Sequence, residues 1–241
     1  MPPVIEISTP ADLKKKIGLK AVVRFAAFVL LVPALFFLSA GRLNWWQGWV
    51  LVSLFLLATF LSRIIALRKN PGLIAERANY DEKADTKPWD KILLPIVAYS
   101  SPITWIIGGL DVRFHWSSQL PLALQLVALA LIILGFALST WAMVANQFFG
   151  VVVRIQKERG HRVVNTGPYR FIRHPGYAGG VLAGLATPLF ISSLWAFIPV
   201  GLLCIASIVR TALEDHTLQE ELPGYAEYAH ITRYRLMPGI W

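Results

Sequence analysis

Long apolar runs alternate with short polar stretches along this chain. Residues 121–145 contain no charged residue, residues 45–67 contain only Arg63, and residues 22–40 contain only Arg24, close to their start. A helix that crosses a bilayer needs about 20 apolar residues, because only a closed hydrogen-bond pattern satisfies the backbone in lipid. The pattern therefore predicts spans at about 22–40, 45–67, 93–110 and 121–145. Pro95 and Pro102 predict kinks in the third.

The last apolar stretch, residues 178–209, is too long for one span. As a single helix it would reach about 48 Å, well beyond the bilayer core. Pro188 and the pair Ser192-Ser193 lie near its middle, with no charge between the halves. A tight helical hairpin fits better. The expected fold class is an all-α polytopic transmembrane helix bundle of about six spans, in one domain covering residues 1–241.

The segment before the first span predicts a short surface helix. Thr9 can cap a helix, Pro10 suits its first position, and Asp12 falls in the positive first turn. Residues 13–20 then form a basic helix on the inner membrane surface. The first apolar run is too long, and lies too far from the start, for a cleaved signal peptide, so we expect an uncleaved span.

The net charge of +9 raises the question of nucleic-acid binding. Basic residues gather before residue 25, at residues 68–91, at residues 154–173 and in the tail, whereas residues 41–44 and 111–118 hold one arginine each. This asymmetry is the positive-inside pattern of membrane proteins. It predicts that both termini and the basic connections are cytoplasmic, most simply at the cell membrane. Membrane topology then explains the net positive charge, and no nucleic-acid binding needs to be assumed.

Motifs of soluble enzymes are absent from the sequence, which has no G-x-G-x-x-G, Walker loop, G-x-S-x-G or H-E-x-x-H. Cys204 is the single cysteine, and the five histidines show no paired metal-ligand spacing. The sequence therefore predicts neither a disulfide framework nor a metal site.

Residues with useful chemistry crowd into two stretches predicted to be cytoplasmic, residues 146–177 and 210–241. In the first, Gly167-Pro168 and Pro175-Gly176 are turns that bracket a segment with Tyr169 and His174. Free backbone N–H groups and nearby cations suit a carboxylate or phosphate, and tyrosine rings suit a flat heterocycle. An interfacial loop that faces lipid headgroups would have the same composition, so both interpretations stand.

The second stretch begins where the last span leaves the bilayer. Arg210 and Glu214 are four residues apart and share a helix face. They could form a salt bridge on a solvated helix end. Alternatively, they could face the bundle interior as a site, with Glu214 holding a cationic or hydroxyl-rich ligand and Arg210 an anionic one.

Together these two stretches resemble the isoprenylcysteine carboxyl methyltransferase and phospholipid methyltransferase superfamily. The resemblance runs from about Asn146 to the C-terminus, and its residues fall into two blocks separated by the hairpin. The first block is His161-x-x-Val164-x-x-Gly167-x-Tyr169-x-x-x-Arg173-His174-Pro175-x-Tyr177-x-Gly179; the second is Arg210-x-x-x-Glu214-Asp215-x-x-Leu218, followed by Tyr225-x-x-Tyr228.

The resemblance implies that the chain binds S-adenosylmethionine in a pocket closed by the cytoplasmic loop and tail. Residues 1–145 would then be N-terminal spans and residues 146–241 the cofactor-binding core. Arg210 is implied to orient the acceptor. The implied cofactor-binding residues are Gln156, His161, Val163, Val164, Tyr169, His174, Pro175, Gly176, Tyr177 and Glu214.

The acceptor is implied to be lipophilic and to reach the site from the bilayer, most simply the carboxylate of an isoprenylcysteine-like substrate. No loop residue stands out as a general base, which favours a carboxylate because an amine or thiol must lose a proton. A phospholipid or small thiol is the alternative.

A different reaction class is also open. Tyr234–Trp241, with Arg173-His174-Pro175, resembles NADPH-dependent sterol reductases, although Gly180 stands where these often carry an acidic residue. A non-enzymatic membrane protein is the third possibility.

Overall fold

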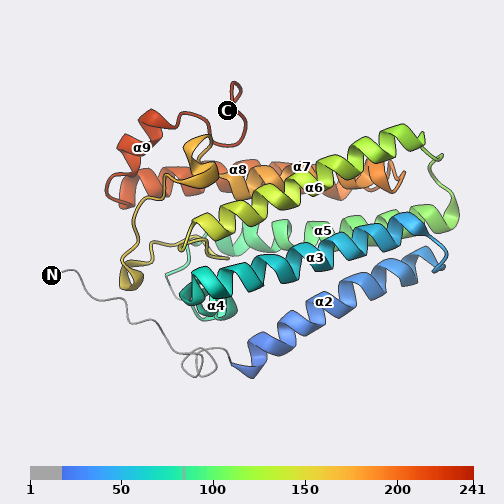
Figure 1. Ribbon diagram of the computed structural model, residues 1–241, viewed down its shortest axis with the longest axis horizontal. Coiled ribbons are helices and arrows are strands. Elements are labelled where there is room, and N and C mark those ends of the chain that lie inside the picture. Colours follow the sequence, from blue (N-terminus) through green and yellow to red (C-terminus); the bar gives the residue numbers. More distant parts are fainter. Residues whose placement is uncertain (1–17, 84) are drawn as a thin grey trace.

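Five long apolar helices form the body of the protein. The computed structural model describes residues 18–83 and 85–241, and the described part of the chain contains no strand. The helices of spanning length are α2 (Leu19–Ala40), α3 (Trp46–Lys69), α5 (Asp90–Phe114), α6 (Leu122–Ala145) and α8 (Phe197–Glu221). They lie side by side along the long axis in Figure 1. The predicted all-α polytopic membrane bundle is confirmed.

The remaining helices are shorter. They are α4 (Pro71–Ala78), α7 (Pro175–Phe190) and α9 (Tyr225–Ile231), with single 3₁₀ turns η1 (Tyr80–Glu82), η2 (Lys157–Arg159) and η3 (Gly167–Arg170). The predicted hairpin is formed by α7 and α8, which turn at residues 191–196. Its first arm, the fifth predicted span, has only 16 residues. The third predicted span is longer than expected, since α5 begins three residues before and ends four residues after the predicted bounds; Pro95 and Pro102 lie inside it. The predicted basic helix at residues 13–20 falls largely outside the described residues.

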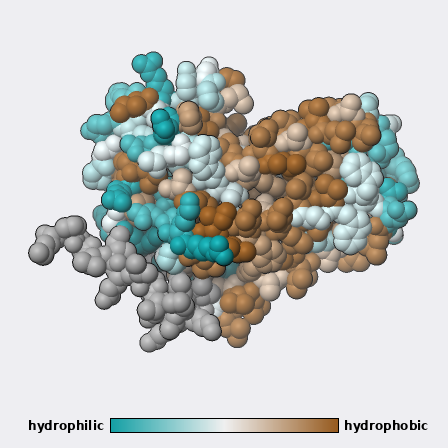
Figure 2. Space-filling model, viewed as in Figure 1, coloured by the Kyte–Doolittle hydropathy of each residue, from teal (hydrophilic) through white to brown (hydrophobic). Residues whose placement is uncertain are grey.

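The surface agrees with a protein that sits in a bilayer. Figure 2 shows a broad apolar band across the middle of the molecule, with hydrophilic residues at both ends. Many large apolar side chains of the long helices are exposed on the bundle, among them Leu30, Leu57, Leu134 and Ile205. Such exposure in water would mark an association surface, whereas lipid is its natural solvent here. We conclude that this is an integral membrane protein.

The two ends of the bundle differ in character. At one end, α4, the loop of residues 146–174, α9 and the C-terminal tail gather together (Figure 1). At the other end, the buried carboxylate of Asp111 accepts hydrogen bonds from the Ser117 N–H and hydroxyl, both at 2.7 Å, and from the Ser193 hydroxyl at 2.6 Å. This contact ties the α5–α6 connection to the hairpin turn. The larger polar end carries the residues singled out from the sequence.

Two glycines let α6 and α7 pack at backbone contact. A Cβ atom added at Gly179 would lie 2.5 Å from the carbonyl oxygen of Gly135, and one added at Gly135 would lie 2.6 Å from that of Gly179. Small residues at helix contacts are typical of membrane bundles, where close packing replaces the hydrophobic effect. This contact gives a structural reason for Gly179 in the first sequence block.

We expect Gly179→Ala to lower the free energy of unfolding by roughly 1–3 kcal/mol, because the new methyl group meets backbone that cannot move aside. The neighbouring Gly180 is the matched control, since nothing lies within 4 Å of a Cβ added there. Gly180→Ala should be neutral, or stabilising by up to about 1 kcal/mol through helix propensity. Thermal unfolding in detergent compares them, and equal midpoints would contradict the packing argument.

Candidate active site

A cavity of about 290 Å³ opens at the polar end of the bundle. Its walls come from α4, α5, the loop of residues 146–174, the start of α7, the last turns of α8, and α9. All but one of the residues predicted to bind cofactor or acceptor line it. The exception is Pro175, which is buried at the first position of α7. The lining residues from that prediction are Gln156, His161, Val163, Val164, Tyr169, His174, Gly176, Tyr177, Arg210 and Glu214.

The C-terminal tail lies directly against the loop. The backbone N–H groups of Arg173 and His174 donate to the carbonyl oxygens of Tyr234 and Arg235, both at 2.9 Å. The Tyr228 hydroxyl donates to the carbonyl oxygen of Tyr169 at 2.7 Å. The tail therefore fixes the very segment between the two predicted turns, in agreement with a pocket closed by the loop and the tail.

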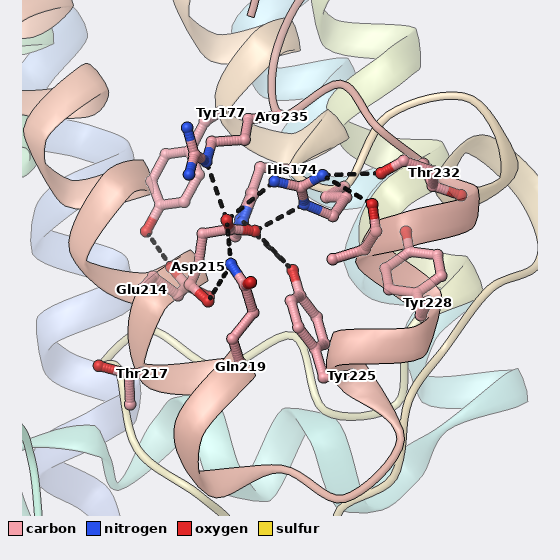
Figure 3. Close-up of polar contacts among 12 residues, drawn as sticks. His174, Tyr177, Glu214, Asp215, Thr217, Gln219, Tyr225, Tyr228, Thr232 and Arg235 are labelled. Carbon is pink, nitrogen blue, oxygen red and sulfur yellow. Dashed lines mark hydrogen bonds and ion pairs between the residues drawn. The ribbon is translucent and has the colours of Figure 1, made fainter.

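Asp215, on α8, is the centre of a buried hydrogen-bond network (Figure 3). Its carboxylate is fully buried and accepts two bonds from the Arg173 guanidinium, from Nε at 2.7 Å and from Nη2 at 2.9 Å. Burying a carboxylate is costly unless it is paired and fully hydrogen-bonded. Here the requirement is met by further contacts from the Arg235 Nε, the Gln219 amide, the Tyr225 hydroxyl and the His174 Nε2, at 2.8–3.2 Å.

Arg173 extends this network into the tail. Its Nη1 donates to the carbonyl oxygens of Thr232 and Arg233, both at 2.7 Å. Asp215 and Arg173 both belong to the blocks recognised in the sequence, but their role as a structural hub was not predicted. The signal was weak, because Arg173 and Asp215 lie 42 residues apart and on opposite sides of the hairpin.

Arg210 and Glu214 do not form the salt bridge that their spacing allowed. The Glu214 carboxylate accepts a hydrogen bond from the Tyr177 hydroxyl at 2.7 Å. Arg210 instead pairs with Asp90, with Nε 2.6 Å from Oδ1 and Nη2 3.0 Å from Oδ2. The interpretation as a solvated salt bridge is therefore wrong, because the guanidinium of Arg210 pairs with the fully buried carboxylate of Asp90 on α5. Both residues line the cavity, as the other interpretation expected.

Asp90 was not predicted as part of the site. It is the first residue of α5, and the predicted span began three residues later. Its Oδ2 also accepts the Val153 N–H at 2.7 Å, while Arg210 donates to the carbonyl oxygen of Val151 at 2.7 Å. The pair thus fastens the start of the loop across the ends of α5 and α8. The only sign of this role in the sequence is that Asp90 is a lone acidic residue at the edge of an apolar run.

Gln156 and His161 shape the loop wall of the cavity. The buried Gln156 side chain donates to the carbonyl oxygen of Phe148 at 2.8 Å and accepts from Arg159. The Gln156 N–H points at Nδ1 of His161 at 3.3 Å, and the imidazole packs on the Phe148 ring with centroids 4.5 Å apart. Burial, and then the charge of Arg159, lower the pKa of His161 to about 4. His161 is therefore neutral at physiological pH and its Nδ1 is an acceptor.

Tyr169 presents a neutral phenol on η3. Burial raises its pKa above the usual range, and its hydroxyl accepts a hydrogen bond from the Asn146 amide at 3.3 Å. With His161 and Tyr177, it makes part of the cavity wall aromatic and uncharged, beside the carboxylate of Glu214. Such a wall suits a ligand with a flat ring and a positive group.

The fold and the site define an integral membrane protein with a polar ligand cavity at one end of its helix bundle. Comparison with known proteins adds the family. A family model described as phospholipid methyltransferase matches residues 124–223. Protein-S-isoprenylcysteine O-methyltransferase B of Arabidopsis thaliana is 26% identical over 146 residues, which cover 57% of this chain and 67% of that protein. A probable protein-S-isoprenylcysteine O-methyltransferase of Oryza sativa subsp. indica is 35% identical over 66 residues, or 27% of this chain and 35% of that protein.

The chain is therefore similar to phospholipid methyltransferases and to protein-S-isoprenylcysteine O-methyltransferases. The predicted enzyme class, methyltransferase, is thereby confirmed. The family match begins on α6 and ends just before α9, so it covers the loop, the hairpin and most of the cavity wall.

We expect Asp215→Asn to destabilise the polar end strongly, because Arg173 and Arg235 would lose their shared anionic partner. Removing one member of a buried ion pair typically costs about 3–5 kcal/mol. Tryptic cleavage after Arg233 or Arg235 reports release of the tail, alongside the unfolding midpoint. The control is Glu220→Gln, which removes the exposed pair with His216 and should change stability by less than about 1 kcal/mol. An intact, protease-resistant tail in Asp215→Asn would contradict the hub role.

Proposed function

We propose that this protein transfers a methyl group from S-adenosylmethionine to a lipophilic acceptor, preferentially the carboxylate of an isoprenylcysteine-like substrate. The observation that supports it best is the meeting of both sequence blocks at one cavity. The Arabidopsis and rice relatives are named for that reaction, and the family model matches residues 124–223, which include most of the cavity wall. In this proposal residues 1–241 work as one domain, with the cofactor-binding core at residues 146–241.

The cavity has groups suited to this donor, which carries a flat purine, a positive sulfonium and an amino acid moiety. In our proposal the rings of Tyr169, Tyr177 and His161 pack on the purine, and Glu214 holds a cationic part of the donor. Gln156, Val163, Val164, His174 and the first turn of α7, including Pro175 and Gly176, complete the wall or support it. A cavity of about 290 Å³ lies near the lower limit of typical small-molecule sites.

The donor supplies an already activated methyl group, so the protein's task is to position the acceptor and exclude water. Arg210 is proposed to orient the acceptor. A carboxylate acceptor is favoured because it needs no base. The Nδ1 of His161 already faces the Gln156 N–H, and the phenol of Tyr169 is kept protonated by burial. A phospholipid or small thiol remains the alternative acceptor.

We further propose that the polar end faces the cytoplasm, so that the charged donor reaches the cavity from water while the acceptor arrives sideways from the bilayer. The excess of basic residues at this end supports that orientation. Single cysteines in a Cys204→Ser background test it. In intact cells, a membrane-impermeant maleimide should label Asn44→Cys and Ser118→Cys but leave Lys157→Cys unlabelled until the membrane is opened. The reverse pattern would invert the topology, and labelling of all three from one side would contradict the spans.

The donor is tested by thermal stabilisation of the purified protein. S-adenosylmethionine at 100 times its dissociation constant should stabilise the fold by about 2.7 kcal/mol, and NADPH should not. Glu214→Gln, His174→Ala and Tyr169→Ala should each weaken donor binding, with about 1.5–3 kcal/mol lost for a charge-assisted contact. The exposed Glu220→Gln is the control for Glu214. Stabilisation by NADPH alone would contradict the proposed donor, and unchanged donor affinity in all three variants would refute the site.

A further inference from the structure

Arg77 is a cavity residue that lies outside the family-matched segment and both sequence blocks. It belongs to α4, the short helix that follows the second span, and it lines the cavity together with Arg210. Its Nη1 donates to the carbonyl oxygens of Phe149 and Gly150, at 3.1 and 3.2 Å. The guanidinium also faces the Phe149 ring, with its carbon 5.6 Å from the centroid. These contacts hold the guanidinium at the wall where the loop begins.

The other semi-buried or buried arginines of the cavity are neutralised by carboxylates behind the wall. Asp90 pairs with Arg210, Asp215 pairs with Arg173, and Glu76 with two further acids surrounds Arg154. The last lining arginine, Arg162, is exposed to solvent. Across residues 18–83 and 85–241, by contrast, Arg77 has hydrogen bonds to carbonyl oxygens but makes no ion pair. The cavity therefore contains one enclosed cation without an anion.

The surroundings of Arg77 make this charge costly in the empty site. Burial first, and then the nearby charges of Arg63 and Arg210, lower the pKa of Arg77 to about 10. It still carries its proton at neutral pH. An anion placed beside it would be bound in a site shielded from water, where charge-assisted hydrogen bonds are strong.

We propose that Arg77 binds the carboxylate of the methyl acceptor and thereby selects a carboxylate substrate over its ester product. This inference rests on the proposed function and names the residue that the N-terminal half contributes to it. Arg210 is less free for that task, because Asp90 occupies its Nε and Nη2. Leu94 of α5 lines the same cavity and brings an apolar span next to the acceptor's path.

The reaction changes the charge that Arg77 recognises. One carboxylate oxygen forms a bond to the methyl carbon while the bond from that carbon to the sulfonium sulfur breaks, and the electron pair stays on sulfur. The products are a neutral ester and a neutral thioether sulfur, and no proton moves. Because the substrate's negative charge is lost on the way to the product, Arg77 stabilises the bound substrate more than the transition state. Its loss should therefore raise KM while leaving kcat unchanged or higher.

The test measures how strongly the protein prefers a carboxylate. The probes are N-acetyl-S-farnesylcysteine, its carboxamide and its methyl ester, each bound to the protein in the presence of S-adenosylhomocysteine. The wild-type protein should bind the carboxylate roughly 10- to 150-fold more tightly than either neutral analogue. Arg77→Gln keeps an amide that can donate to the loop carbonyls but lacks the charge, so it should bind the carboxylate and the neutral analogues equally. Arg77→Lys keeps the positive charge and should retain most of the preference. KM for the carboxylate should rise by the same factor in Arg77→Gln.

Arg159→Gln is the matched control. Arg159 also anchors this loop, by donating to the carbonyl oxygen of Gln147 at 2.8 Å, but it does not line the cavity. The ratio should survive in that variant. A ratio that survives in Arg77→Gln overturns the inference alone, and so does a loss confined to donor affinity, which would assign Arg77 to the donor's own carboxylate. A wild-type protein with no preference for the carboxylate overturns both the inference and the proposed acceptor.

Discussion

The carboxylate of Asp215 is completely buried at an end of the molecule that borders lipid, and the site depends on how its charge is compensated. Its hydrogen-bond donors come from four segments: the loop before α7, the last turns of α8, α9, and the tail. None of these segments can move away without leaving a buried charge unpaired, which is among the costliest changes in a protein. The tail is therefore an integral wall of the cavity.

A second buried carboxylate extends the same principle to the N-terminal half. Asp90 links α5 to Arg210 on α8 and to the loop backbone at Val153. Lipid gives no hydrophobic drive to bring helices together, so polar contacts of this kind decide which helix ends meet. The two carboxylates neutralise arginines behind the cavity wall. Glu214 is then the acidic group that lines the cavity. The enclosed basic group without an ion pair is the guanidinium of Arg77, which lines the same cavity.

The sequence predicted well whatever follows from local composition. A bilayer demands about 20 apolar residues for each span, so the helices could be located within a few residues, and the 32-residue run had to fold back on itself. Ten of the eleven site residues implied by the resemblance line the cavity, because the resemblance covers the loop and the hairpin. Pairings between distant segments were out of reach. Asp90 and Arg210 are 120 residues apart, and nothing near Asp90 marks its partner. The 3.6-residue helical period correctly placed Arg210 beside Glu214, but it could not reveal that each prefers a partner on another helix.

The unequal arms of the hairpin explain where the cavity lies. Counted from the turn, Tyr177 on α7 and Arg210 on α8 are each thirteen residues along their helix, so they stand at the same height, and the Tyr177 hydroxyl meets Glu214 one turn further on. Close to this level α7 ends, whereas α8 continues. In total α8 is nine residues longer than α7, which corresponds to about 13 Å of additional rise. The bundle therefore has a step, and the loop and tail fold onto it. A helix of 16 residues rises only about 24 Å, less than the roughly 30 Å of a bilayer core. We therefore expect the floor of the cavity to lie below the level of the lipid headgroups, where a hydrocarbon chain and a charged head can be held on either side of one boundary.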